Sequence, residues 1–364
     1  MKHLNPEFSE AGLDRVVTMT TSQENFVRAE IVGGTGVLTL TREKALNALS
    51  RSMYHQIAGA LQDWAKDPAI TQVVMQSTLP KALCAGGDIK EVREAALDGR
   101  SDEVEDTFGT EYAMDNLIAE YPKPYVAMMN GIVMGGGMGI SVHGSHRIVS
   151  DTTQMAMPET AIGFFTDIGA SYFLPRVSRE TADGARETSP EFGRYLGLSG
   201  ARFNGADAIA LGLADIYITS TDAEAFVKLT ISDGVDAAVA RFGQEPPASE
   251  IITKWDEVQQ TYGGDSLEAI VERAGSDLDG MSPTALVRVF ELLNAGAQDN
   301  DVRSCLEREL SMATAAAQSA EFLEGVRAMM VDKDKNPQWS PATVADVDSE
   351  EIRRVVATKT ELPF

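Results

Sequence analysis

The first 220 residues consist of short apolar segments separated by turn-forming residues. Segments 26–31 and 37–40 flank the turn Gly33-Gly-Thr-Gly36, and this arrangement predicts a β-hairpin. Segments 70–75 and 125–129 are continuous apolar runs, and each of them leads toward a glycine-rich loop. Short runs bounded by turn residues are typical of buried strands. The pattern therefore predicts a sheet built from several short strands.

Helical periodicity alternates with these strands. A helix is expected from Ser50 to Asp67, with an apolar face made of Met53, Ile57, Leu61 and Trp64. A charged helical region is expected over residues 89–120. After about residue 219 the strand pattern ends, and helices are expected near 222–243, 250–275, 282–297 and 300–331. The alternation predicts an α/β body of repeated ββα units. We expect a lead-in over 1–24, a core over 25–220 and a helical C-terminal region over 221–364 that packs on the core.

Two glycine-rich junctions share one chemistry. They are Lys81-Ala-Leu-Cys-Ala-Gly-Gly-Asp88 and Asn130-Gly-Ile-Val-Met-Gly-Gly-Gly-Met-Gly139, and each ends an apolar run before a predicted helix start. The first N–H groups of a helix have no partner within the helix, and missing Cβ atoms let a ligand approach the main chain. Two junctions can thus supply two convergent donors, which is the arrangement of an oxyanion hole. The alternative is that these glycines only allow tight turns and close packing.

Two carboxylates lie on the turn-rich segment Ala156-Met-Pro-Glu-Thr-Ala-Ile-Gly-Phe-Phe-Thr-Asp167, shortly after the second junction. Acids placed on such a connection suggest general acid–base or nucleophilic catalysis by Glu159 and Asp167. For Asp167 an ordinary helix N-cap is the competing interpretation.

These motifs, in this order, resemble the crotonase (enoyl-CoA hydratase/isomerase) superfamily and, within it, the 3-hydroxyisobutyryl-CoA hydrolase branch. The resemblance covers nearly the whole chain and includes Leu46-Asn-Ala-Leu49, Cys84-Ala-Gly-Gly-Asp88, Gly135-Gly-Gly-Met-Gly-Ile-Ser-Val-His-Gly144, Met157-Pro-Glu-Thr-Ala-Ile-Gly163, Tyr172-Phe-Leu-Pro-Arg176, Met281-Ser-Pro-Thr284 and Glu324-Gly-Val-Arg-Ala328. It implies a crotonase-like spiral of ββα units.

The resemblance also implies a set of site residues. The main-chain N–H groups of Cys84 and Gly136 would form the oxyanion hole. Glu159 would lie over the acyl group and either activate water as a general base or attack the thioester to give a mixed anhydride. Asp167 would contact the substrate hydroxyl or water, and Glu111 would contact the substrate. The remaining implied positions are Gly135 and Gly137 for the substrate, and Leu46, Asn47, Ala82 and Lys333 for the CoA moiety.

Two positions depart from the patterns of the superfamily. The branch commonly has Phe-Pro-Asp where this chain has Phe165-Thr-Asp167, so the turn that aims the carboxylate lacks its proline. Enoyl-CoA hydratases carry a second catalytic glutamate where this chain has Gly139. The hydratase interpretation therefore lacks its acid–base pair unless another residue fills the gap. Glu111 is the candidate for that role, and a solvated helix charge is the alternative.

Composition narrows the class of protein further. The 364 residues carry a net charge of −24, which argues against binding to nucleic acid or to an anionic membrane. The only cysteines, Cys84 and Cys305, have no metal-ligand spacing, so a reducing compartment is expected. The first residues lack an apolar signal segment and an Arg-rich amphipathic character, and we expect a soluble, cytoplasmic protein that forms a homo-oligomer or a monomer.

Other chemistries fit the sequence poorly. No histidine is placed by motif as a base for a Cys84 thiolate. Gly139-Ile-Ser-Val-His-Gly144 misses the serine hydrolase elbow by one residue. His143 and His146 are three residues apart but lack a third metal ligand, so no metal is expected. The triple-glycine segment fails the dinucleotide-binding pattern in every register.

The expected activity is therefore hydrolysis of a short, branched 3-hydroxyacyl-CoA thioester, most consistent with 3-hydroxyisobutyryl-CoA of valine breakdown. The expected partner is the acyl-CoA substrate, whose CoA is part of the substrate, and no other cofactor is expected. An enoyl-CoA hydratase or isomerase is the alternative enzyme, and a non-catalytic acyl-CoA binder is the alternative from another class.

Overall fold

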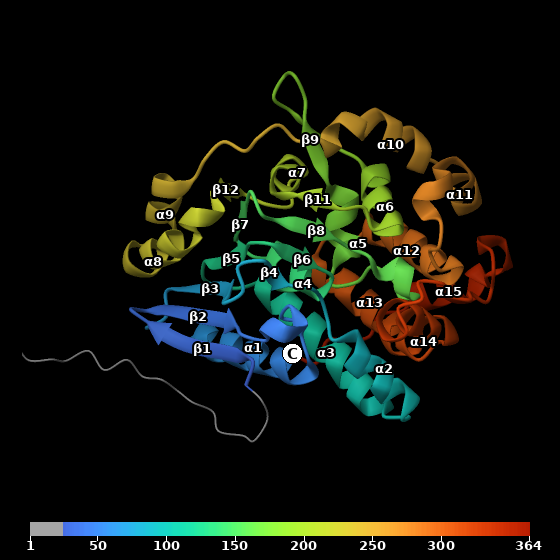
Figure 1. The fold of residues 1–364 in the computed structure, drawn as a ribbon, viewed down its shortest axis with the longest axis horizontal. Coiled ribbons are helices and arrows are strands. Elements are labelled where there is room, and N and C mark those ends of the chain that lie inside the picture. Colours follow the sequence, from blue (N-terminus) through green and yellow to red (C-terminus); the bar gives the residue numbers. More distant parts are fainter. Residues whose placement is uncertain (1–24) are drawn as a thin grey trace, which may run out of the picture.

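A computed structural model describes residues 25–364, and the lead-in expected over residues 1–24 lies outside the described residues. Most of the strands form two sheets at the centre of the molecule, one of six strands and one of four, and helices surround them (Figure 1). Among the described residues, no helix is long and apolar enough to cross a membrane.

The larger sheet has six strands in the order β1-β2-β3-β5-β7-β12. Their bounds are β1 Val27–Val32, β2 Thr35–Leu40, β3 Gln72–Ser77, β5 Tyr125–Met129, β7 His146–Ser150 and β12 Ile216–Ile218. The predicted hairpin is confirmed, because β1 and β2 pair antiparallel through the turn at Gly33 and Gly34. From β2 to β12 all neighbours are parallel.

The second sheet has the order β11-β8-β6-β4. Its bounds are β4 Ala82–Cys84, β6 Ile132–Met134, β8 Gln154–Ala156 and β11 Phe203–Asn204. Strands β4, β6 and β8 are parallel, and each follows a strand of the larger sheet along the chain, namely β3, β5 and β7. A helix follows each pair. This repeated ββα connection is the spiral expected from the sequence.

Both faces of the larger sheet are buried. On β3, Val73 and Met75 belong to the main hydrophobic core, while Val74 between them faces a second cluster. Side chains of a strand alternate between its two faces, so a continuously apolar run is what a sheet covered on both sides requires. The second cluster is closed by Phe226 and Val235 of the helices after β12.

The helices are α1 Arg51–Lys66, α2 Ile89–Leu97, α3 Ser101–Ala119, α4 Gly136–Val142, α5 Ala170–Phe173, α6 Pro190–Ser199, α7 Gly205–Ala210, α8 Ala223–Asp233, α9 Val235–Phe242, α10 Trp255–Tyr262, α11 Leu267–Ala274, α12 Pro283–Gly296, α13 Val302–Ala317, α14 Ala320–Val326 and α15 Ser349–Val356. The helix expected after Ser50 is confirmed as α1.

Several long helical segments of the prediction are divided. The region 89–120 forms two helices, because Gly99 adopts φ +70° between them and L-residues rarely continue a helix through that conformation. Gly234, with φ +91°, divides α8 from α9 in the same way. Helix was correctly expected on both sides of each glycine, but the breaks at Gly99 and Gly234 were not predicted.

No strand follows β12 within the described part of the chain, and α8 to α15 occupy the rest. In Figure 1, α8 and α9 cover one end of the large sheet, whereas α12 to α15 lie on the opposite side, against α3 and α5. The C-terminus returns to α1 and α3, where Pro363 contacts Gly109. Residues from both halves share the main core. The division of the chain near residue 220 stays a prediction.

Candidate active site

Sheet topology gathers the predicted site at one edge. Strands β4, β6 and β8 are parallel neighbours, so their carboxyl ends meet at the same edge of the small sheet. Cys84 ends β4, Met134 ends β6 and Ala156 ends β8. The amide of Gly135 donates to the carbonyl of Ala156 over 3.4 Å, so the triple-glycine turn directly adjoins the segment that leads to Glu159. The two glycine junctions and the acidic loop are thus brought together.

The triple-glycine turn needs glycine for close approach. Gly135 adopts φ +47° and ψ −126°, a conformation that L side chains rarely adopt. A β-carbon built on Gly136 would lie 3.3 Å from the amide nitrogen of Gly87. One built on Gly137 would lie 2.4 Å from the carbonyl oxygen of Cys84. The missing side chains therefore allow the entry of α4 to lie directly against the loop after β4.

The amide expected to act together with that of Gly136 lies at the end of β4 or in the loop after it. Gly136 is the first residue of α4, so its N–H has no helical partner. The Gly87 N–H likewise donates to no carbonyl or side chain of residues 25–364. Cys84, the donor implied by the resemblance, ends β4 three residues earlier, and its carbonyl faces Gly137. The pairing of the Cys84 and Gly136 amides in an oxyanion hole stays a prediction.

The Cys84 side chain is unsuited to nucleophilic attack. It is fully buried, and its sulfur accepts a hydrogen bond from the amide of Gly86 over 3.3 Å. Burial raises the pKa of the Cys84 thiol to about 12. The reactive form of a cysteine is the thiolate, which this environment disfavours.

Glu159 lies where the edge of the sheet meets the entry of α4. A β-carbon built on Gly135 would lie 2.8 Å from Glu159 Oε1, so glycine at 135 leaves space for the carboxylate. The Oε2 atom is buried and has no hydrogen-bond partner in the described part of the chain. Burial raises the pKa of Glu159 well above its ordinary value, and the nearby Asp167 and Glu111 raise it further. An unpaired buried carboxyl of this kind is typical of a functional site.

Asp167 also points into the buried site. Its Oδ2 accepts a hydrogen bond of 2.6 Å from the Tyr112 hydroxyl. Burial raises the pKa of Asp167 to about 7, although the bond from Tyr112 lowers it. Helix α5 begins only at Ala170 with Gly169 as its N-cap, so the N-cap interpretation of Asp167 is wrong. In place of the missing proline, the Thr166 hydroxyl donates to the carbonyl of Gly197 and fixes the turn.

Two carboxyls of α3, those of Glu111 and Asp115, point toward the glycines of α4. Glu111 is only 5% exposed and accepts a hydrogen bond of 2.7 Å from the Tyr54 hydroxyl, so the solvated-charge interpretation is wrong. Asp115, one helical turn further, was missed by sequence reasoning. A β-carbon built on Gly139 would lie 2.7 Å from Asp115 Oδ2, so this aspartate fills the space that a side chain at 139 would take. The four-residue spacing of Glu111 and Asp115 on one helix face was the available signal.

The segments expected to line a CoA path are only partly brought together. Leu46 accepts from the amide of Ala85, and the Asn47 amide group donates to the carbonyl of Leu83 over 2.9 Å, so both adjoin β4 and therefore Ala82. Asn47 is fully buried, and the contact of these positions with CoA stays a prediction. Lys333 is exposed in the turn after Arg327–Val331.

Asp115→Asn is expected to stabilise the protein increasingly as pH rises. Asp115 is fully buried, neither oxygen has a partner among residues 25–364, and burial raises its pKa well above the ordinary value. A carboxyl whose pKa is raised by folding costs nothing below its unfolded pKa. Above that pH, it costs about 1.4 kcal/mol for each pH unit until the folded pKa is reached. Urea unfolding of both proteins at several pH values measures the difference, and a pH-independent difference would contradict this account.

Comparison with known proteins agrees with the fold. A family model described as enoyl-CoA hydratase/isomerase matches residues 35–356. Mitochondrial 3-hydroxyisobutyryl-CoA hydrolases are similar to this chain. The protein from Danio rerio is 34% identical over 94% of this chain and 92% of its own length, and the one from Homo sapiens is 32% identical over 90% and 87%. The chain therefore belongs to the enoyl-CoA hydratase/isomerase, or crotonase, family of acyl-CoA enzymes.

Solved structures carry different names. A carnitinyl-CoA dehydratase from Mycobacterium thermoresistibile is 36% identical with a TM-score of 0.84, and an enoyl-CoA hydratase from Rhodobacter sphaeroides is 33% identical with a TM-score of 0.83. Each similarity covers 92% of this chain and 97% of the other. The fold class expected from the sequence is confirmed. The expectation of a cytoplasmic protein is corrected, because the similar hydrolases are named as mitochondrial.

Proposed function

We propose that this protein hydrolyses a short, branched 3-hydroxyacyl-CoA thioester, with 3-hydroxyisobutyryl-CoA of valine breakdown as the substrate. The observation that carries the proposal is the buried Glu159 carboxyl beside Gly135 of the triple-glycine turn, whose Oε2 has no partner in the described part of the chain. The hydrolase names of the similar mitochondrial proteins support the same reaction. Gly139 provides no second acid from α4, which weakens the case for hydration.

In the proposed reaction, the thioester oxygen lies between the main-chain N–H groups of Cys84 and Gly136. Donors aimed at an oxyanion in a dry site lower the barrier, and each is typically worth about 3–4 kcal/mol. As a base, Glu159 takes a proton from water while the water oxygen bonds to the acyl carbon. The C–S bond then breaks, and the proton leaves with the CoA sulfur. The products are the free acid and CoA.

The same carboxyl can act as a nucleophile. Glu159 oxygen then bonds to the acyl carbon, CoA leaves, and water opens the resulting anhydride to restore the carboxylate. Asp167 and Glu111 flank Glu159 in both routes, as their mutual effects on pKa indicate. With its pKa near 7, Asp167 can either accept from the substrate hydroxyl as a carboxylate or donate as an acid.

Hydration or dehydration is a second candidate, because Asp115 offers a carboxyl beside Gly139. Together with Glu159 it would form an acid–base pair drawn from α3 instead of α4. The names of the two similar solved structures also favour this class. Asp115→Asn should abolish hydration if Asp115 belongs to such a pair.

A panel of acyl-CoA thioesters distinguishes the candidates. Free thiol release reports hydrolysis, and loss of the enoyl absorbance of crotonyl-CoA reports hydration. We expect thiol release to be fastest with 3-hydroxyisobutyryl-CoA and crotonyl-CoA to remain unhydrated. Hydration without thiol release would replace the proposal with the second candidate. Affinity for CoA without turnover of any thioester would indicate a binding protein.

The rate of hydrolysis is expected to rise through neutral pH. Glu159 must be ionised to act as base or nucleophile, and burial holds its pKa well above the ordinary 4.5. Because a raised pKa keeps the carboxyl protonated to higher pH, activity is lost as pH falls through that raised value. Measurement of kcat/KM from about pH 5 to about pH 9 gives the pKa in the free enzyme. If kcat/KM instead fell at low pH with an apparent pKa near the ordinary glutamate value, another group would control the rate.

A further inference from the structure

A buried glutamate of the C-terminal helical region holds the turn that carries Asp167. Glu309 of α13 is fully buried. Its Oε2 accepts from the amide of Gly169 over 2.7 Å, and its Oε1 accepts from the amide and the hydroxyl of Ser171 over 3.1 and 2.5 Å. Three donors within four residues of Asp167 therefore converge on one carboxylate. Burial raises the pKa of Glu309 to about 8, although the bonds from Ser171 and Gly169 lower it, so these three donors are what this buried carboxyl has in place of water.

The turn after Asp167 has little support of its own. Ile168 adopts φ +57° and Gly169 φ +79°, and a left-handed conformation is strained for a β-branched residue. Helix α5 has only four residues, too few to be stable alone. The Ile168 carbonyl is held from the other side by His143 Nε2 at 2.7 Å. A strained turn persists only when its surroundings impose it, and Glu309 supplies most of the bonds that do so.

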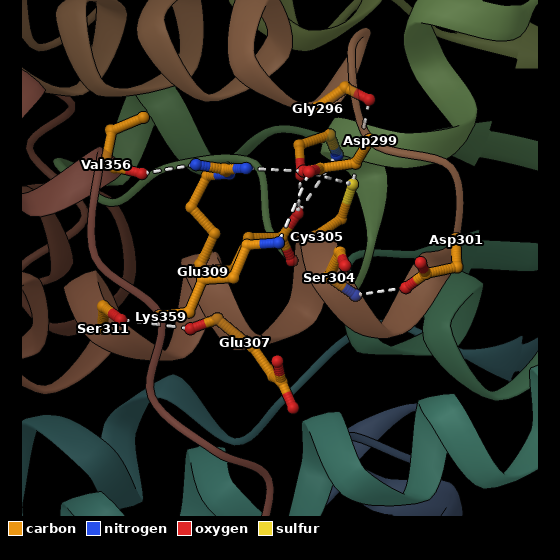
Figure 2. A network of polar contacts seen from close by, with 12 residues as sticks. Gly296, Asp299, Asp301, Ser304, Cys305, Glu307, Glu309, Ser311, Val356 and Lys359 are labelled. Carbon is orange, nitrogen blue, oxygen red and sulfur yellow. Dashed lines mark hydrogen bonds and ion pairs between the residues drawn. The ribbon is translucent and has the colours of Figure 1, made fainter.

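The helix that carries Glu309 is itself anchored. Figure 2 shows the polar network around Asp299, which lies in the connection between α12 and α13, together with Glu309 of α13. Arg308, next to Glu309 in sequence, donates to Asp299 over 2.7 Å and to the carbonyl of Val356 over 2.6 Å. Lys359 of the C-terminal segment contacts the other Asp299 oxygen. These bonds fix α13 relative to α12 and to the last residues of the chain.

We infer that Glu309 is a positioning residue for Asp167, so that the C-terminal helical region completes the active site. Glu309 acts through the main chain of the turn and does not touch the reacting atoms. The kinetic part of this inference rests on the proposed function, because it needs a reaction in which Asp167 takes part. The structural part of the inference, that Glu309 protects the turn, does not rest on the proposed function.

A double-mutant cycle tests the kinetic part. Glu309→Gln keeps the size of the side chain but presents an amide group to one of the N–H donors. It should lower kcat for thiol release by about 10- to 100-fold, since small misplacements of a positioned group cost this much. In a protein already carrying Asp167→Asn, the added Glu309→Gln should change kcat less than about twofold. Multiplicative losses in the double variant would overturn the inference, because a general structural defect acts independently of Asp167.

Glu307→Gln is the matched control. Glu307 lies on the same helix, pairs with Arg303 over 3.0 Å and does not contact the turn. Its substitution should leave kcat within about twofold of the parent protein. If Glu309→Gln does not fold, Ser171→Ala removes only the hydroxyl donor to Glu309. It should give a smaller loss of kcat with the same dependence on Asp167, and an additive loss would again overturn the inference.

Hydrogen exchange tests the structural part without any substrate. The amides of Gly169 and Ser171 should exchange faster in Glu309→Gln than in the parent or in Glu307→Gln, because they lose their acceptor. Unchanged exchange at these amides would overturn the inference even if the enzyme is a hydrolase. Faster exchange in a protein that cleaves no thioester would reject the proposed function and keep the role of Glu309 in the turn.

Discussion

Glu159→Gln is expected to lower kcat for thioester hydrolysis by about 10²- to 10⁴-fold, the usual contribution of a positioned acid or base. Glutamine matches the size of glutamate, so the substituted side chain fits beside Gly135. It cannot take a proton from water or form an anhydride. The main-chain amides of Cys84 and Gly136 remain, so KM should change much less than kcat. Steady-state assays of thiol release measure both constants.

Cys84→Ala is the control for this prediction. Cys84 is buried in the same loop, and its high pKa keeps the thiol protonated. The alanine variant should therefore retain most of the turnover. A folded Cys84→Ala protein without activity would favour covalent thiol chemistry, and an active Glu159→Gln protein would remove Glu159 from the mechanism.

Heavy-oxygen water separates the two roles of Glu159. In a single turnover through an anhydride, one labelled oxygen enters the acid product or the Glu159 carboxylate, depending on which carbonyl water attacks. General-base catalysis places the label only in the acid. Mass spectrometry of the peptide that contains Glu159 therefore distinguishes the routes, and label in the peptide requires nucleophilic attack.

Local patterns predicted the strands and helices because each depends on nearby residues. The continuous apolar run 125–129 became β5, a strand buried on both faces. Glycines 99 and 234 divided helices whose apolar faces continued beyond them, since periodicity does not report a single left-handed residue. The resemblance to crotonases implied the spiral of ββα units, but the separate sheet of β4, β6 and β8 was not predicted.

The site was predicted where its chemistry is local and missed where it depends on tertiary contacts. The glycine junctions, Glu159 and Asp167 stand in short motifs. Asp115 was missed, because only the packing of α3 against α4 brings it to Gly139. Glu309 lies 138 residues from Ser171, and in sequence it is one of many helix charges. Only the packing of α13 against α5 and α3 gives it a function.

Gly296→Ala is expected to destabilise the protein although alanine is the better helix former. A β-carbon on Gly296, near the end of α12, would lie 2.1 Å from the carbonyl oxygen of Ser171, and a backbone atom cannot move aside cheaply. Overpacking at the upper end of its usual range costs about 3 kcal/mol, and the gain in helix propensity is about 1 kcal/mol. The net loss should be about 2 kcal/mol in urea unfolding.

Gly59→Ala is the matched control within α1, because nothing lies within 4 Å of its β-carbon position. It should stabilise by up to about 1 kcal/mol. Equal changes for the two variants would show that α12 tolerates a shift away from α5, and with it from the turn that carries Asp167.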